Sequence, residues 1–219
     1  MAQPPDLARR IAEREAENEA ARAQYTYRQT VEMDEVQPRG GHYREVREVV
    51  FSPSAERSER AVGTPINTLQ RLLLTQEDFD DIRNIQPVLL TPEALSRYHV
   101  RFRGDETIDG LDCWVLEIRP RQVFQGLRYF EGVLWALKST YDVVRLEGQA
   151  VPPIYSKGQE NLFPRFITFR GQVEGKFWFP FRTFADDILP FRNGPLRIRF
   201  QIRYEQYKRF GAESTITYK

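Results

Sequence analysis

The sequence has few thiol and imidazole side chains. Its 219 residues include one cysteine, Cys113, and two histidines, His42 and His99. One chain therefore cannot supply the usual four Cys and His ligands of a zinc site, and it cannot form an internal disulfide. We predict neither a bound metal nor another cofactor.

An excess of charge of one sign and long apolar runs are also lacking. Lys and Arg total 32 against 31 Asp and Glu, which gives a net charge of +1. A nearly neutral chain has no overall field that would draw it onto DNA or RNA, so we predict no nucleic-acid partner. The longest apolar run, Val133 to Leu137, is far shorter than the roughly 20 residues that a membrane-spanning helix needs, so we predict no transmembrane segment.

The beginning of the sequence leaves two interpretations open. Residues Met1 to Pro5 contain no basic segment followed by an apolar one, so the sequence as given shows no secretory signal. The protein is either cytoplasmic or a mature chain from which a signal has been trimmed before Ala2 and Gln3.

Motifs of common enzyme classes are missing as well. The sequence has no Gly-x-Ser-x-Gly elbow, phosphate-binding loop, His-Glu-x-x-His or dinucleotide fingerprint. Asp80-Asp81 and Asp186-Asp187 are adjacent acidic pairs, but neighbouring side chains diverge on a helix and point to opposite faces on a strand. We interpret these pairs as solvated acids and Cys113 as a packing residue. The sequence therefore predicts a protein that is not an enzyme.

The N-terminal segment predicts a helix. Residues 6–24 contain no Gly or Pro, and Asp6 can cap the helix after two prolines. The apolar stripe consists mainly of alanine, which allows close approach to a neighbour but buries little area. This helix is expected to cover another element rather than to form a core of its own.

Strand periodicity dominates the remainder, from residue 25 to about 218. Apolar and polar residues alternate, and short turns such as Asn193-Gly194 separate the alternating segments, which indicates antiparallel hairpins. Two short helices are predicted over 75–85, capped by Thr75, and over 91–95. We predict an α+β fold with one large curved antiparallel sheet of about nine to eleven strands and a few helices against its apolar face.

The predicted strands carry more aromatic and aliphatic area than these helices can cover. An antiparallel sheet needs a buried face, so the surplus indicates either a sheet curled enough to fill itself or a cavity for an acyl chain. Adjacent strand residues such as Phe177 and Trp178 cannot both point inward. The candidate residues for lining a lipid cavity are Trp114, Leu116, Trp135, Leu137, Phe177, Trp178, Phe179 and Phe200.

Four segments of these strands resemble a known family. They are Gly110–Pro120, Glu131–Trp135, Val144–Gly148 and Phe177–Pro180. Their succession of apolar residues and glycines resembles LolA-like proteins, which include bacterial outer-membrane lipoprotein-sorting carriers and regulators of the MucB type. The resemblance covers roughly residues 25–218.

The resemblance implies a single LolA-like domain over residues 1–219, built as an unclosed half-barrel whose hydrophobic concavity is covered by helices. In that family the concavity takes acyl chains of lipoproteins or related lipids, without catalysis, in the periplasm. The expected partner is therefore a lipid or an acylated lipoprotein, and the trimmed-signal interpretation is favoured. The alternative is an envelope interaction or sensing module of the same fold, with a protein partner and no transported cargo. The carriers also keep a cavity arginine that contacts the lid, but no motif identifies a matching arginine here.

Overall fold

Over the residues that it describes, this computed structural model consists of one large antiparallel sheet, a separate two-stranded sheet and three helices. The described residues are 4–52, 54, 56–84, 90–124, 126–156 and 159–209. The helices are α1 (Leu7–Arg22), α2 (Gln76–Asn84) and α3 (Pro92–Leu95). The strands are β1 (Tyr25–Glu35), β2 (His42–Phe51), β3 (Arg57–Ala61), β4 (Ile66–Asn67), β5 (Tyr98–Ile108), β6 (Leu111–Pro120), β7 (Tyr129–Leu137), β8 (Val143–Val151), β9 (Ile154–Ser156), β10 (Gln159–Asn161), β11 (Phe166–Val173), β12 (Phe177–Leu189) and β13 (Leu196–Arg209).

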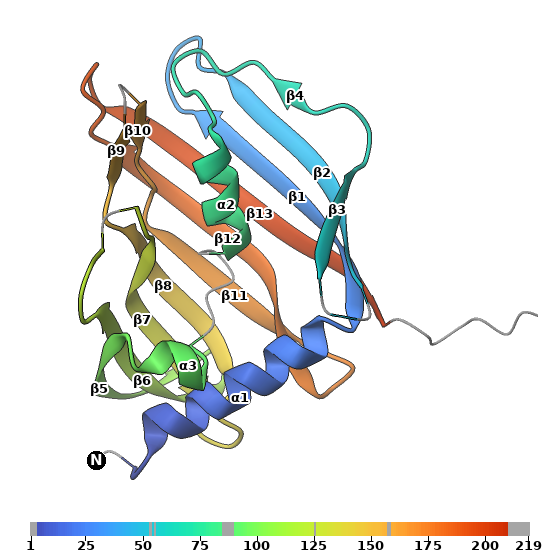
Figure 1. Cartoon of the computed structure of the whole chain (residues 1–219), viewed down its shortest axis with the longest axis vertical. Coiled ribbons are helices and arrows are strands. Elements are labelled where there is room, and N and C mark those ends of the chain that lie inside the picture. Colours follow the sequence, from blue (N-terminus) through green and yellow to red (C-terminus); the bar gives the residue numbers. More distant parts are fainter. Residues whose placement is uncertain are drawn as a thin grey trace, which may run out of the picture.

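The large sheet is open at both edges. Its strand order is β3-β2-β1-β13-β12-β11-β8-β7-β6-β5, and the short strand β4 pairs with β2. Because β3 and β5 lie at opposite ends of this order, the described strands form a curved sheet rather than a closed barrel (Figure 1). Strands β1 and β13 pair inside the sheet, with Val31 opposite Ile202 and Met33 opposite Phe200. The predicted α+β half-barrel with a large antiparallel sheet is confirmed.

The helices cover one face of the sheet, which we call the helix side (Figure 1). One core cluster joins Leu7 and Ile11 of α1 and Ile82 of α2 to sheet residues such as Leu116 and Phe200. Burying a large apolar side chain stabilises the fold by about 1.5 to 3 kcal/mol, so this cluster is the main source of stability. The core therefore lies between the concave face of the sheet and the helices.

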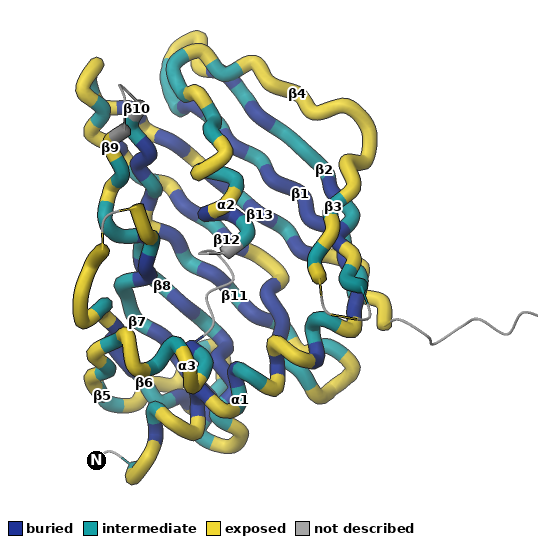
Figure 2. The backbone as a smooth tube through the Cα atoms, in the orientation of Figure 1, coloured by how far each residue is buried: buried dark blue, intermediate teal, exposed yellow. Residues whose placement is uncertain are grey.

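A second apolar cluster lies on the face away from the helices. Cys113, Trp135 and Leu137 belong to it, whereas Leu134, the neighbour of Trp135, belongs to the main core. Successive strand residues point to opposite faces, which explains this division and the alternating burial along the strands in Figure 2. Burial raises the pKa of the Cys113 thiol to about 11, so this cysteine is an inert packing residue at neutral pH.

The structure confirms one of the two predicted helix caps, that of Thr75. Thr75 Oγ1 accepts a hydrogen bond from the Asp78 amide at 3.3 Å, and Thr91 caps α3 through the Ala94 amide. The prediction for Asp6 is wrong: its backbone is left-handed, with φ 56°, and its side chain makes no capping hydrogen bond. Residue 85 of the predicted second helix and residues 210–218 of the predicted β-rich body lie outside the described residues.

Polar contacts fix α1 on the sheet. Arg14 Nε lies 2.6 Å from Asp142 Oδ1, and Asn18 Nδ2 donates to the same oxygen at 2.8 Å. Asn18 Oδ1 in turn accepts from the Trp178 amide at 3.1 Å. Because Asp142 is almost completely buried, these charge-assisted contacts are stronger than surface ion pairs. Hydrogen bonds thus hold the alanine-rich helix on the sheet, because its small apolar stripe provides little stabilisation.

Candidate functional site

The structure separates the eight predicted lining residues. Leu116 and Phe200 lie fully buried in the main core on the helix side, and Trp114 packs half-buried against that core. Phe177 and Phe179 belong to a separate aromatic cluster that also contains residues near the C-terminal end of α1. The residues that share the helix-side core are therefore Trp114, Leu116 and Phe200.

The other three predicted residues pack away from that core. Trp135 and Leu137 belong to the cluster on the face away from the helices, and Trp178 packs against it. Trp135 Nε1 donates to Glu106 Oε2 at 2.8 Å, and the Arg145 guanidinium lies 4.7 Å from the centre of the Trp135 ring. These contacts hold Trp135 on the outer face, where it cannot touch a ligand on the helix side.

Helix α2 lies over the middle of the helix side (Figure 1). It places two apolar side chains on the sheet: Ile82, which is fully buried in the main core, and Phe79, which packs against it. The ring of Phe79 lies 6.1 Å from that of Tyr43, and the Arg47 guanidinium lies 5.0 Å from its centre. The remaining side chains of α2 are polar, so its apolar hold on the sheet is small.

Polar contacts join α2 to three separate parts of the rim: the segment before β7, the strand β10 and the edge strand β3. They link Asp81 Oδ2 to Arg128 Nη2 at 3.1 Å, Asn161 Nδ2 to Asp78 Oδ1 at 2.8 Å, and Arg83 Nε to Glu59 Oε1 at 3.1 Å.

The pair of Asp81 and Arg128 is buried. Their side chains are 5% and 8% exposed, and Arg128 also donates to the carbonyl oxygens of Pro152 and Asn161. Burial raises the pKa of Asp81 to about 7, although the charge of Arg128 acts in the opposite direction. Burial likewise raises the pKa of Asp78 and lowers that of Arg128. The charge on this contact therefore depends on pH near neutrality, and the interpretation of Asp81 as a solvated acid is wrong.

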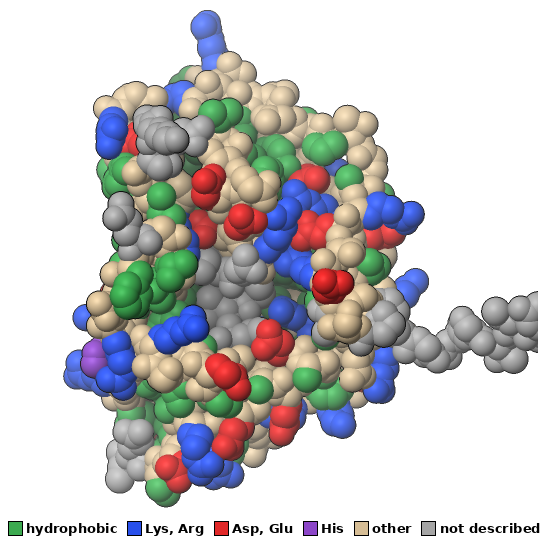
Figure 3. Space-filling model, viewed as in Figure 1, with side chains coloured by type: hydrophobic (Ala, Val, Ile, Leu, Met, Phe, Trp, Pro, Cys, Tyr) green, Lys and Arg blue, Asp and Glu red, His purple; other side chains and the backbone are tan. Residues whose placement is uncertain are grey.

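A charged cluster occupies the β2 and β3 part of the helix side, beneath α2. Arg47 Nη2 lies 2.5 Å from Glu45 Oε2, and its Nη1 lies 2.6 Å from Glu59 Oε2. Arg57 and Arg83 contact the same Glu59 carboxylate. Positive and negative side chains gather at this place in Figure 3. The helix side thus combines a wide apolar area with one charged border.

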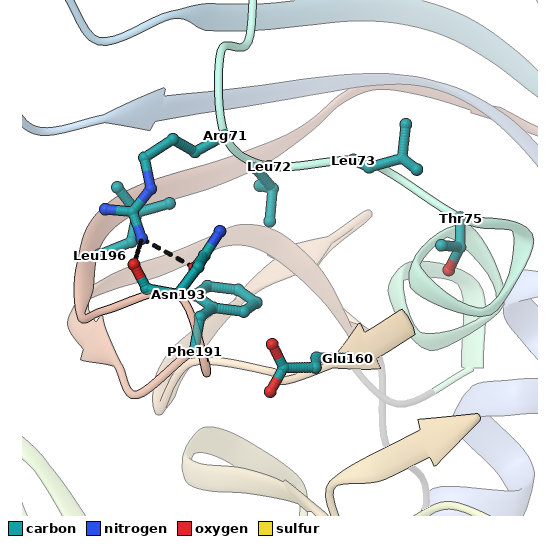
Figure 4. A pocket seen from close by; sticks show the side chains of 8 residues that line it. All are labelled: Arg71, Leu72, Leu73, Thr75, Glu160, Phe191, Asn193 and Leu196. Atoms are coloured by element: carbon teal, nitrogen blue, oxygen red, sulfur yellow. Dashed lines mark hydrogen bonds between the residues drawn. The ribbon is translucent and has the colours of Figure 1, made fainter. Parts of the chain in front are cut away.

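A small cavity opens beside the segment that leads into α2 (Figure 4). Its volume is about 170 Å³, and Leu72, Phe191 and Leu196 form its apolar wall. Arg71, which donates to backbone carbonyls of the turn between β12 and β13, and Glu160 line its polar wall. Ligand pockets usually have about 300 to 1,000 Å³, so this cavity is too small to hold an acyl chain. It adjoins the main core, because Leu196 is a core residue.

The described residues offer neither a metal-binding cluster nor a membrane-spanning helix. No group of three or more His, Cys, Asp or Glu side chains among them is placed to hold a metal ion. No helix among them combines the length and the apolar character needed to cross a bilayer.

Asp186, of the second acidic pair, contacts Arg197 at 2.7 Å and Arg199 at 3.3 Å on the sheet surface.

Sequence reasoning missed Asp78 and Arg128, and it set Asp81 aside as a solvated acid. The signal that could have pointed to Asp78 is its spacing from Thr75, because a residue three positions after a cap can return a hydrogen bond to it. No comparable pattern identifies Arg128, since its partner on α2 lies 47 positions earlier in the chain.

Comparison with solved structures finds proteins of low sequence identity to this chain. No family model matches the sequence, and no curated protein matches it. A DUF1329 family protein from Desulfovibrio piger matches with a TM-score of 0.46 and 15% identity, over 97% of this chain and 96% of that chain. A LolA superfamily protein from Nitrosomonas europaea matches with a TM-score of 0.37 and 15% identity, over 100% and 99%. An outer membrane lipoprotein-sorting protein domain from Vibrio parahaemolyticus matches with a TM-score of 0.39 and 14% identity, over 92% and 93%.

Two of these three matches are to proteins described as belonging to the LolA superfamily or to lipoprotein sorting. At these identities and TM-scores the matches say nothing about function. What the chain binds has to be argued from its own residues.

Proposed function

We propose that this protein is a non-catalytic carrier that binds the acyl chains of a lipid or lipoprotein outside the cytoplasm, as a periplasmic protein does. The main support for the proposal is the small apolar contact between α2 and the face of the sheet that it covers. Helix α2 lies over the concave core with two apolar side chains, Phe79 and Ile82, and is otherwise held by polar contacts at the rim. Such a cover can be displaced without dismantling the sheet.

The energies support displacement by an acyl chain. Uncovering two large apolar side chains costs about 3 to 6 kcal/mol at about 1.5 to 3 kcal/mol each. The three rim contacts all involve charged groups, for which a hydrogen bond contributes about 1.5 to 3 kcal/mol, so lifting α2 costs about 8 to 15 kcal/mol. A chain with about 14 buried CH₂ groups contributes about 11 kcal/mol, at about 0.8 kcal/mol each. One long acyl chain thus contributes an energy of the size needed to replace α2 on the sheet, whereas a short one falls below it.

The residues proposed to touch the chain are those that α2 and its neighbours now cover. Leu116 and Phe200 form the floor, and half-buried Trp114 lies against the same core. Phe177 and Phe179 extend the apolar surface only if α1 also shifts, because their cluster includes Ala21 at the end of that helix.

Tryptophan fluorescence can test the proposal by comparing the two faces of the sheet. The double variant Trp135→Phe and Trp178→Phe keeps Trp114 as the reporter on the helix side. The matched double variant Trp114→Phe and Trp178→Phe keeps Trp135 as the reporter on the outer face. Delipidated samples of both are titrated with a diacylated peptide and with a fatty acid. We expect a saturable change in the emission of Trp114 and none in that of Trp135.

Two results would count against acyl-chain binding. One is an unchanged Trp114 emission in a sample that native mass spectrometry shows to be free of bound lipid. The other is an equal change at both reporters, which would indicate non-specific adsorption. A lipid-sized mass adduct on the freshly purified protein, lost on delipidation, would support the proposal independently.

An envelope interaction module is the second candidate function. Strand β5 spans eleven residues and pairs only with β6 among the described strands. An edge of this length offers backbone donors and acceptors to an added strand of another protein. Pull-down from an envelope extract with the lipid-free protein and with the lipid-saturated protein separates the functions. A partner captured equally by both samples favours the interaction module.

A further inference from the structure

The connection between β6 and β7 exposes large apolar side chains close together. Val123, Phe124 and Leu127 are 46%, 51% and 54% exposed, and they lie within five consecutive residues. Among the described residues, no other window of five consecutive residues contains three exposed large apolar side chains. The Leu127 amide donates to the Phe124 carbonyl oxygen at 3.3 Å, which holds these two residues in one turn. We call Val123, Phe124 and Leu127 the apolar tip.

Two arginines share a cleft with the apolar tip. Arg97 and Arg121 line it together with Phe124 and Leu127, and its volume is about 490 Å³. The Arg121 amide donates to the Arg97 carbonyl oxygen at 2.8 Å, which keeps the two segments side by side. Apolar side chains lie beside basic ones at the left edge of Figure 3, where Figure 1 places the connection between β6 and β7. The cleft therefore brings apolar and cationic groups to one surface.

The charge around the tip is positive. Segments 96–101 and 119–128 contain five arginines and no acidic residue. Within the described part of the chain, neither Arg97 nor Arg121 forms an ion pair, whereas Arg119 is paired with Glu117. The two guanidinium groups beside the tip are thus available to an anionic partner.

From this combination we propose that the apolar tip and the arginines Arg97 and Arg121 dock the protein on the surface of an anionic phospholipid bilayer. Guanidinium groups bind phosphate through charge-assisted hydrogen bonds, and exposed Phe and Leu side chains enter the acyl boundary beneath the headgroups. A stable protein partner usually covers about 800 Å² on each side, which is more than three side chains of one loop offer. A membrane needs no such area, because a few apolar side chains and basic residues suffice for reversible binding.

This docking is separate from acyl-chain binding. It uses residues at the rim of the sheet, outside the core beneath α2, and it requires no bound cargo. The Trp114 titration reports on cargo and the vesicle assay below reports on docking, so failure of either proposal can be recognised by itself.

Vesicle co-sedimentation tests the docking surface. The full chain is mixed with vesicles of phosphatidylcholine alone and of phosphatidylcholine with phosphatidylglycerol, at low and high salt. We expect binding to the anionic vesicles, weakened by salt. The double variant Phe124→Ser and Leu127→Ser should lose at least about tenfold in affinity. Arg97→Gln and Arg121→Gln should each lose about fivefold at low salt.

Matched controls come from the far edge of the sheet and from β12. Arg60→Gln removes one exposed arginine on β3. Ile188→Ser removes an apolar side chain on β12 that is 61% exposed. Both should bind the anionic vesicles like the wild type. Unfolding curves of all variants are needed to check that the substituted chains are folded.

Three outcomes would overturn the proposal. The first is no binding of the wild type to anionic vesicles, which would leave the tip to a protein partner. The second is unchanged binding after substitution of Phe124 and Leu127. The third is equal loss in Arg60→Gln and Arg97→Gln, which would show that net charge alone attracts the protein.

Discussion

Arg170 of β11 and Glu15 of α1 form a buried ion pair between the sheet and the first helix. Arg170 Nη1 lies 2.6 Å from Glu15 Oε1, and both side chains are 1% exposed. Burial raises the pKa of Glu15, although Arg170 acts in the opposite direction. Two charges withdrawn so completely from water are tolerable only together, so the pair fixes where α1 lies across the strands.

Removing one member of this pair should therefore cost more than removing both. Glu15→Ala leaves the Arg170 charge buried, and we expect it to lower the free energy of unfolding by about 3 to 5 kcal/mol. The double variant Glu15→Leu and Arg170→Met should recover most of that loss. Urea unfolding measures both changes. A single variant within about 1 kcal/mol of the wild type would show that the pair opens to water in solution.

Two glycines in the segments that resemble LolA-like proteins have a packing role. Gly132 and Gly148 lie opposite each other on β7 and β8, and a Cβ atom on Gly132 would come within 2.2 Å of the Glu147 carbonyl oxygen. A Cβ atom on either glycine would also lie within 2.7 Å of the Phe130 ring. The ring thus covers both glycines on the helix side.

Alanine at Gly132 or Gly148 should consequently displace Phe130 or the strand backbone. We expect each substitution to lower the stability by about 1 to 3 kcal/mol, as overpacking does. Thermal unfolding measures the loss, and Gly175→Ala, at a hairpin tip with no neighbour near its Cβ, separates this crowding from backbone strain. Equal losses at all three glycines would argue against a role for the Phe130 ring.

The long strands could be predicted because their period is two and their turns are local. Leu196 to Tyr204 alternate after Asn193-Gly194, and the structure contains that hairpin as β12 and β13. The three strands of two or three residues, β4, β9 and β10, escape prediction because such segments are too short to show a period.

The face of the sheet on which each site residue lies could be predicted only in part. Alternation places Leu134 and Trp135 on opposite faces, but it does not say which face the helices will cover. That choice depends on contacts remote in sequence, such as that of Glu15 with Arg170. The burial of Asp81 has the same origin, because Arg128 reaches it from a segment that helical periodicity does not connect to α2.

Glu35 fastens the segment before α2 to the end of β1. Its two carboxylate oxygens accept hydrogen bonds from four backbone amides, those of Gly41, Gln70, Arg71 and Leu72, at 2.7 to 3.0 Å. Burial alone would raise the pKa of Glu35, but these four donors outweigh it and the pKa is lowered. The ionised carboxylate therefore stabilises the fold at pH values above 4.5, the ordinary pKa of this group.

Two measurements check this role. Glu35→Gln replaces an acceptor by a donor and leaves backbone amides unpaired, so we expect a loss of about 1 to 3 kcal/mol in the free energy of unfolding at neutral pH. Because the pKa is lowered in the folded state, the wild type should lose this stability as the pH falls below 4.5. A variant that keeps the wild-type slope of stability against pH in that range would contradict the assignment.

The raised pKa of Asp81 makes the hold on α2 depend on pH. The carboxyl has a pKa of about 7 when α2 is in place and an ordinary value near 3.8 when it is in water. The covered state therefore binds the proton more tightly, so its extra stability is present below about pH 4 and is lost as the pH rises through about 7. Asp78, whose pKa burial also raises, acts in the same direction.

Hydrogen exchange of the α2 amides follows this equilibrium directly. After correction for intrinsic exchange, we expect protection of α2 to fall as the pH rises from about 5 to about 8, while protection of β13 stays constant. Asp81→Asn should flatten most of the dependence and leave the smaller part due to Asp78. Glu77→Gln, which removes an exposed carboxylate from the same helix, should change the profile only slightly, because Glu77 raises the pKa of Asp78 less than burial does. If Asp81→Asn also changes it only slightly, the ion pair with Arg128 does not control the opening of α2.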